Sequence, residues 1–164
     1  MFANRLPQIE KNLKMLYEQL AATEEEALMT QNPRGRMQCQ QQIREQIEPK
    51  IRKYETEYFQ VLQQQSQEWE FADEDAQAAI DVLAQEVERV NHQPDSYPQE
   101  MMEILQRIEA KLNEPGTTAS GKLKGTLSLL PPFIGLFYEG ELDTENFCRK
   151  YFPTFTRLVK SAKK

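Results

Sequence analysis

The sequence predicts an all-α protein: a long antiparallel helical hairpin of coiled-coil type packed with two shorter helices, then an aromatic-rich C-terminal segment and a short helix. Good helix formers such as Gln, Glu, Leu and Ala dominate the 164 residues, whereas Gly occurs only six times. Hydrophobic residues make up 39%, which indicates a thin core. Apolar residues also recur at helical spacing over long stretches. This combination argues against a β-sandwich, a Rossmann fold or a TIM barrel.

The first helix is expected over about residues 4–31. Pro7 falls in its first turn, where a missing backbone N–H costs nothing. A loop is expected at 31–35 because this stretch contains Asn32, Pro33 and Gly35. Alternating spacings of three and four residues predict a heptad seam along the helix, consisting of Leu6, Ile9, Leu13, Leu16, Leu20, Thr23 and Ala27.

The second arm of the hairpin is expected over about residues 36–69. Pro49 lacks a backbone donor and clashes with the carbonyl of Glu45, which predicts a kink near 46–49. We expect a kink rather than a break because the heptad spacing continues through it. This seam is predicted to consist of Met37, Gln40, Arg44, Ile47, Ile51, Tyr54, Tyr58, Val61 and Gln65. It closes within one chain or pairs with a second chain, and both interpretations stay open.

Two amphipathic helices are expected to follow the hairpin, at about 73–91 and 97–113. Acidic residues 73–75 suit the positive end of the first helix dipole. The predicted apolar stripe of the first helix is Ala76, Ala79, Ile80, Leu83, Val87 and Val90. The stripe of the second is Met101, Ile104, Leu105, Ile108 and Leu112. Both stripes need a surface to cover, and the hairpin is the predicted one.

The C-terminal third has a different composition. Residues 1–115 carry 12 basic and 22 acidic side chains, net −10, whereas residues 116–164 carry 8 basic and 4 acidic, net +4. Seven of the fifteen aromatic residues lie between Phe133 and Phe155. We therefore expect a hairpin and bundle over 1–115, a linker over 116–125, and an aromatic and basic segment over 126–164 that packs on the bundle or on a partner.

The apolar strip 127–138 is the most unusual feature of this segment. Its paired prolines at 131 and 132 are not expected inside a helix or a central strand. A helix is expected to start near 143–146, with Phe147, Tyr151 and Leu158 on one face, and to be interrupted by Pro153. The strip either completes the core of the bundle or forms a partner surface together with the later aromatics.

Aromatic residues beside Arg have the composition of an interface hot spot. The predicted partner-interface residues are Phe133, Ile134, Leu136, Phe137, Tyr138, Phe147, Arg149, Tyr151, Phe152 and Phe155.

The sequence offers little catalytic chemistry. A single His, His92, in a polar loop cannot build a catalytic triad or, with two distant cysteines, an ordinary zinc site. There is no glycine-rich phosphate loop. The alternating acids Glu139, Glu141, Asp143 and Glu145 are interpreted as solubilising charges, with a divalent cation site as the alternative. We predict no enzyme activity, no cofactor and no metal.

The expected location is the cytoplasm. No apolar stretch is long enough to cross a bilayer, and the first residues lack the pattern of a secretory signal. Cys39 and Cys148 are therefore expected to be reduced thiols. The net charge of −6 argues against nucleic-acid binding.

Two stretches show a resemblance to known proteins. Residues 16–20, Asn32-Pro33 and 41–43 resemble the helical hairpins attached to bacterial signalling and conflict-system proteins, including NTPases of the NACHT/STAND type and caspase-like proteases. The block from Leu129 to Phe133, with Tyr138-Glu139 and residues 141–145, is similar to a tail in the same group. The resemblance implies a non-catalytic adaptor or effector-associated module and carries over no catalytic residues.

The leading functional hypothesis is therefore a non-catalytic protein-interaction module in bacterial signalling or defence, which binds a protein partner or closes a homodimer. One alternative is a membrane-active helical effector, since an aromatic segment beside a basic tail suits an anionic lipid surface. Another is a structural dimerisation coiled coil, whose dimer would survive deletion of residues 116–164.

Overall fold

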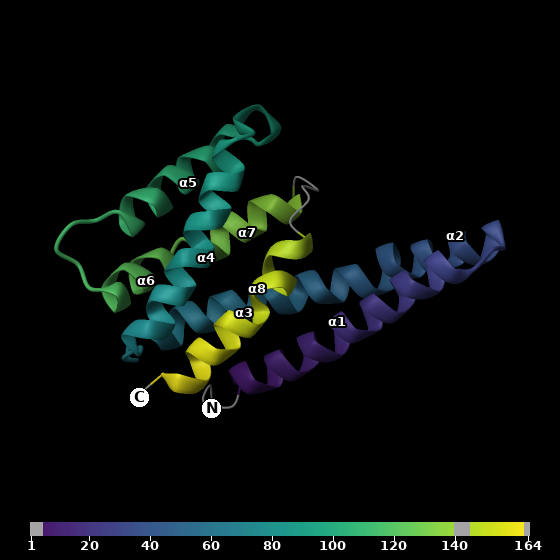
Figure 1. Cartoon of the computed structure of the whole chain (residues 1–164), viewed down its shortest axis with the longest axis horizontal. Coiled ribbons are helices and arrows are strands. Elements are labelled where there is room, and N and C mark those ends of the chain that lie inside the picture. The colour runs from purple at the N-terminus through teal and green to yellow at the C-terminus, as the bar shows by residue number, and fades with distance from the viewer. Residues whose placement is uncertain (1–4, 140–144, 163–164) are drawn as a thin grey trace. The chain divides into compact units, whose positions relative to one another are not determined.

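The computed structural model describes residues 5–139 and 145–162, apart from the side chains of Pro94, 137–139 and 145–148. The regular elements in this part of the chain are all helical, so the predicted all-α class is confirmed (Figure 1). The chain divides into two compact units, Met1–Val61 and Leu62–Lys164. The boundary falls inside helix α3 (Glu48–Ser66).

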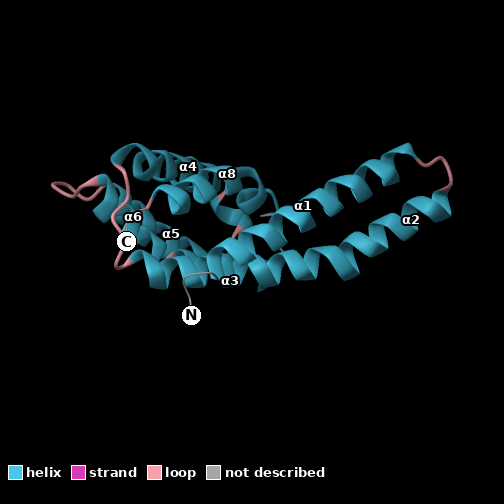
Figure 2. Ribbon diagram, turned by 90° about the horizontal axis from the view of Figure 1, so that it is seen from below, coloured by secondary structure: helices cyan, strands magenta, loops and turns pink. Residues whose placement is uncertain are grey.

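The first unit is a helical hairpin. Helix α1 (Arg5–Met29) is joined by one loop to α2 (Pro33–Gln42), which continues through the π-helical turn η2 (Ile43–Ile47) into α3, as Figure 2 shows. The seam predicted for the first arm is confirmed in full, because the buried residues of α1 are Leu6, Ile9, Leu13, Leu16, Leu20, Thr23 and Ala27.

Polar contacts join α1 to the first part of α3. The Arg5 Nε donates to Glu57 at 2.6 Å, and the Tyr58 hydroxyl donates to Glu10 at 3.1 Å. The Tyr17 hydroxyl donates to Glu55 at 2.7 Å. Each contact has a specific partner on the facing helix, so together they fix the register of the two arms more narrowly than apolar packing does.

The predicted helix through Pro49 is confirmed, and the distortion lies one turn before the proline. The Glu48 N–H donates to the carbonyl of Ile43, which is the five-residue spacing of a π-helix. This wider turn relieves the clash expected between the Pro49 ring and the preceding turn.

The π-helical turn also corrects the predicted seam of the second arm. Met37 is 68% exposed, and Gln40 and Arg44 are exposed as well. Cys39 is buried instead, together with Ile47. A π-helical turn holds more residues than an α-helical one, so it shifts the phase of everything before it. Beyond it, Ile51, Tyr58 and Val61 are buried as predicted, whereas Tyr54 and Gln65 are only half-buried.

The second unit is built around α4 (Asp73–Asn91), which lies against α5 (Gln99–Leu112), α6 (Ala119–Leu127) and α8 (Glu145–Ser161). The predicted stripe of α4 is buried in full. That of α5 is buried apart from the half-buried Ile104. A short 3₁₀ turn, η3 (Pro94–Ser96), lies in the connection between the two helices.

Helix α6 occupies most of the stretch predicted as a linker. Thr118 caps it by accepting the Gly121 N–H at 3.1 Å, and Gly116 takes a positive φ of 76° in the turn before it. Leu123 and Leu127 are fully buried, which accounts for a helix in a sequence of weak helix propensity. The compact units therefore separate at residue 61 rather than at the expected 116–125, and α4 to α8 belong to one unit.

Helix α7 (Leu130–Glu139) contains the paired prolines that were not expected inside a helix. Pro131 and Pro132 fall in its first turn, where the backbone N–H groups have no partner within the helix. The helix packs against α5 and α6. The apolar strip is therefore helical from Leu130 onward.

Helix α8 runs through Pro153, so the expected interruption is wrong. Pro153 is exposed, which leaves the backbone carbonyl that loses its hydrogen bond on the solvent side of the helix. On the opposite side Tyr151, Phe155 and Leu158 are buried. The Ser161 hydroxyl donates to Asp75 at 2.5 Å and ties the end of α8 to the start of α4.

Replacing Glu10 by Gln should stabilise the hairpin at neutral pH. Burial raises the pKa of Glu10 above its ordinary value of 4.5, and the hydrogen bond from Tyr58 lowers it by a smaller amount. A carboxyl group with a raised pKa binds protons more strongly in the folded state, so its charge costs stability as pH rises through that pKa. Gln keeps an acceptor for Tyr58 and carries no charge.

The measurement is urea unfolding of both proteins between pH 3 and 8, followed by circular dichroism. We expect the Glu10→Gln variant to gain stability over the original protein above the raised pKa, and the difference to vanish well below pH 4.5, where both side chains are neutral. A variant that is less stable at neutral pH would show that the Tyr58 hydrogen bond outweighs desolvation.

Candidate functional site

Four of the ten predicted residues of the C-terminal interface are buried. Phe133 and Ile134 on α7 are 7% and 3% exposed, and Tyr151 and Phe155 on α8 are 6% and 1% exposed. Since α8 packs along α4, with the Tyr151 hydroxyl 3.4 Å from its acceptor on Gln85, these aromatics are core residues. The four buried residues have almost no surface to offer a partner, which argues against their assignment to an interface.

The other predicted interface residues fall into two groups. Leu136, Arg149 and Phe152 are half-buried and keep some accessible surface. The side chains of Phe137, Tyr138 and Phe147 lie outside the part of the chain that the structure describes. The side chains of Glu139, Glu141, Asp143 and Glu145, considered as a cation site, lie outside it too.

The exposed apolar side chains are on the hairpin instead. Leu28 is 84% exposed and Met29 is 76% exposed, both in the last turn of α1. Met37, on α2, is 68% exposed, and Met15 lies farther back along α1 at 60%. Methionine is flexible and polarisable, and Met-rich surfaces are typical of adaptable binding sites. Leu28, Met29 and Met37 are hereafter called the tip residues.

An open groove of about 500 Å³ lies between α1 and α2 near this end of the hairpin. Its apolar part consists of Ala27, Leu28 and Ile43, and its polar part of Glu24, Arg36 and Gln40. The residues buried near this end are small: Thr23 and Ala27 on α1 and Cys39 on α2. Small residues bring two helices close but fill little of the space beside the seam.

The loop at the tip is held by local hydrogen bonds. The Asn32 side chain caps α2 by accepting the Arg34 N–H at 3.0 Å, and Pro33 starts the helix. The Arg36 guanidinium donates to the carbonyl of Thr30 at 3.3 Å and links α2 back to the end of α1. The tip residues therefore flank a loop whose conformation is held by hydrogen bonds. This reduces the conformational entropy lost when a partner binds.

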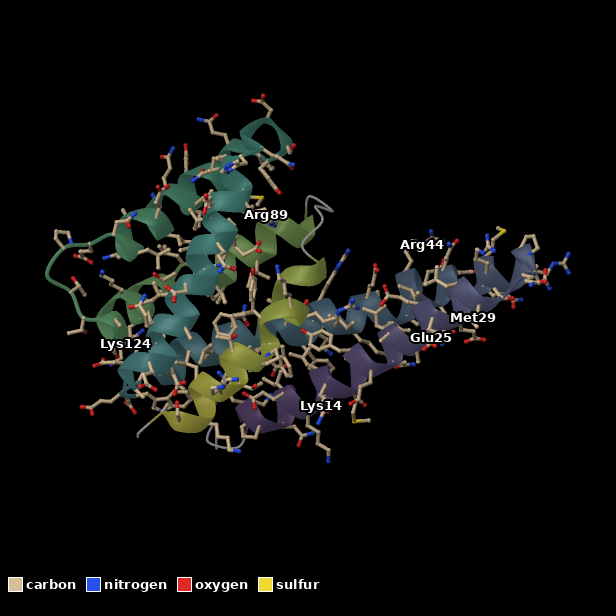
Figure 3. The ribbon with its side chains drawn as sticks, in the orientation of Figure 1. Lys14, Glu25, Met29, Arg44, Arg89 and Lys124 are labelled. Atoms are coloured by element: carbon tan, nitrogen blue, oxygen red, sulfur yellow. The ribbon has the colours of Figure 1, made fainter. Side chains whose placement is uncertain are left out.

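Near the tip, the two arms of the hairpin carry charges of opposite sign. Residues 18–29 on α1 contain four Glu and no Lys or Arg, whereas residues 33–44 contain three Arg and no Asp or Glu. Figure 3 shows Glu25 along the α1 edge of the hairpin and Arg44 along the other edge. The charged residues that line the groove itself are Glu24 on α1 and Arg36 on α2.

The described residues show little sign of reaction chemistry. Among them, no group of His, Cys, Asp and Glu is arranged to hold a metal ion. Cys39 is a buried free thiol. His92 is exposed, as predicted, with its Nδ1 2.7 Å from the carbonyl of Glu88. In the same part of the chain, no helix combines the length and the apolar character needed to span a membrane.

Comparison with protein families, with curated proteins and with solved structures finds no match for this chain. Its surface therefore has to be interpreted from its own residues. Sequence reasoning missed the tip residues because it assigned Met37 to the seam. The sequence did contain one indication of the tip residues, because Leu28 and Met29 are large apolar residues that lie outside the heptad stripe of α1.

Proposed function

We propose that this chain is a non-catalytic protein-interaction module of the adaptor type, and that it binds protein through the tip of the α1–α2 hairpin. The observation that carries the proposal is the 84% exposure of Leu28 beside an open groove. Exposed apolar surface costs about 25 cal/mol for each Å², and contiguous patches of it mark interaction sites.

The surroundings of Leu28 support the proposal. Ala27 and Ile43 continue its apolar surface into the groove, and Arg36 and Gln40 give the border polar groups that can fix the orientation of a partner. The resemblance of the hairpin to modules of bacterial NACHT/STAND and caspase-type systems supports a role in signalling or defence.

The proposal is tested by photo-crosslinking. A benzophenone amino acid is placed at Leu28 or Met37 in the full chain, and extracts of the native cells are irradiated. Met15 is the matched control position, because it is an exposed apolar residue outside the tip. We expect discrete adducts from the two tip positions and not from Met15.

Competition decides whether these adducts are specific. Excess unlabelled protein should suppress them, whereas a Leu28→Glu variant should not, and circular dichroism should show that this variant folds because Leu28 is exposed. Absence of adducts, equal adducts from Met15, or equal competition by the variant would each contradict the proposal.

A further inference from the structure

We infer that Pro49 is a positioning residue for the tip groove. The proline imposes the π-helical turn η2, and this turn decides which face of α2 lines the groove. The inference rests on the proposed function of the tip, because it names a residue outside the groove on which that site depends. It follows from the spacing and burial of the residues of α2 and from the hydrogen bonds of η2.

The residues of α2 and η2 that line the groove have the spacing of a heptad seam. Arg36, Gln40 and Ile43 lie four and three residues apart, and Ile47 continues the same spacing four residues later. In a continuous α-helix, residues at this spacing share one face. Ile47 is 1% exposed, whereas Arg36 and Gln40 are exposed and Ile43 is half-buried. The buried face therefore changes between Ile43 and Ile47, which are the bounds of η2.

The burial of Cys39 gives the size of this change. In a continuous α-helix, the residue two turns before Ile47 is Gln40, seven residues away. The buried residue of α2 is instead Cys39, eight residues away. One extra residue in a helical turn rotates the preceding part by roughly 100° relative to the part that follows. This rotation carries Cys39 into the seam and moves Arg36 and Gln40 out to the wall of the groove.

The hydrogen bonds place the extra residue in η2, directly before Pro49. The Ile43 N–H still donates to the carbonyl of Cys39, four residues earlier. The Glu48 N–H donates to the carbonyl of Ile43, five residues earlier. Pro49 has no N–H to continue an α-helical pattern, and in a regular turn its ring would clash with the carbonyl of Glu45. It is the only proline of the second arm after the first residue of α2, so the wider turn is assigned to it.

Without Pro49, the second arm should relax to a continuous α-helix. Such a helix regains the α-helical hydrogen bonds and brings the stripe of groove-lining residues into the seam. A long side chain such as Arg36 can lie along an apolar surface and keep its charged end in water, so its charge does not prevent the rotation. Cys39 would then leave the seam, and the groove beside Leu28 would lose the wall to which Ile43 belongs.

The experiment measures alkylation of the Cys39 thiol by iodoacetamide, with peptide mass spectrometry to separate it from Cys148. In the original protein Cys39 is 7% exposed and should react slowly. In the Pro49→Ala variant the thiol should react roughly tenfold faster or more, because it is no longer buried. Circular dichroism should show at least as much helix in this variant. Benzophenone placed at Leu28 should give fewer adducts in it, because the groove has changed its wall.

Two control variants separate the phase of α2 from a general effect of losing a proline. Deletion of Gln46 together with Pro49→Ala should restore both the slow alkylation of Cys39 and the adducts from Leu28. Gln46 is an exposed residue of η2, and its removal leaves a continuous α-helix with the original phase of α2. Pro153→Ala removes an exposed proline from inside α8 in the second unit and should leave the alkylation of Cys39 unchanged.

Several results would overturn the inference. Equal protection of Cys39 with and without Pro49 would show that the π-helical turn has another cause. Fast alkylation that the deletion does not reverse, or adducts from Leu28 that persist while Cys39 reacts, would each separate the groove from the phase of α2. Failure of the proposed function is distinguishable. If Leu28 gives no specific adduct even in the original protein, the tip is not an interaction site, and the alkylation rates still decide whether Pro49 sets the phase.

Discussion

Replacing Phe155 by Ala should destabilise the second unit by about 3–5 kcal/mol, the usual cost of removing a buried aromatic side chain. Phe155 is 1% exposed and lies on the face of α8 with Tyr151 and Leu158, which are buried as well. The truncation removes apolar contacts and leaves a cavity in the place of the ring. The total stability of such a unit is of the order of 5–15 kcal/mol, so the loss is a large part of it.

Urea unfolding followed by tryptophan fluorescence measures the effect. Trp69, the single Trp of the chain, lies in the second unit and is 6% exposed. Phe152→Ala is the matched control, because it makes the same truncation one turn away at a half-buried position, and it should cost much less. If both variants cost the same small amount, Phe155 is not a core residue, and the original assignment of the C-terminal aromatics to an interface regains support.

This comparison shows why the C-terminal strip could not be interpreted from the sequence. The buried cores of interfaces and the interiors of proteins are both rich in aromatic and aliphatic residues. Phe133 and Phe155 would therefore look the same in either setting. Only the packing of α7 on α5, and of α8 on α4, decides between them. Short helices such as α6 depend on that packing too, and their local sequence does not predict them.

The long helices were predictable because their periodicity extends over many turns. The stripes of α1 and α4 are buried residue for residue as the spacing indicates. In the second arm, only Ile47, Ile51, Tyr58 and Val61 of the predicted seam are buried. One π-helical turn shifted the phase before it, moving Met37 to the surface and Cys39 into the seam. Pro49 marks the place of the distortion, but its type depends on which hydrogen bonds the whole arm can keep.

Recognition of the candidate site from the sequence depended on the same helical phase of α2. With Met37 assigned to the seam, the tip had no visible apolar surface on α2. With Met37 exposed, each arm has an exposed large apolar side chain near the end of the hairpin, Leu28 and Met29 on α1 and Met37 on α2. The charge difference between the arms was readable from the sequence throughout. Which of these charges line the groove, Glu24 and Arg36, is shown only by the structure.

Replacing Tyr17 by Phe should destabilise the hairpin by about 1–3 kcal/mol, the cost of leaving a buried polar group with an unmet hydrogen bond. The Tyr17 hydroxyl donates to Oε2 of Glu55 at 2.7 Å, and Glu55 is only 2% exposed. Phe fills the same volume and keeps the apolar contacts of the ring. The loss therefore reports the hydrogen bond to the carboxyl group rather than packing.

Tyr58→Phe is the matched control, since it deletes another hydroxyl that bonds a glutamate across the same pair of helices. Its acceptor Glu10 is only half-buried, so water can replace the lost 3.1 Å bond and the cost should be smaller. Amide hydrogen exchange along α1 measures both variants, because opening of the hairpin exposes these amides. Faster exchange in Tyr17→Phe than in Tyr58→Phe would place the register of the arms under the control of Glu55. The reverse order would instead assign that control to Glu10.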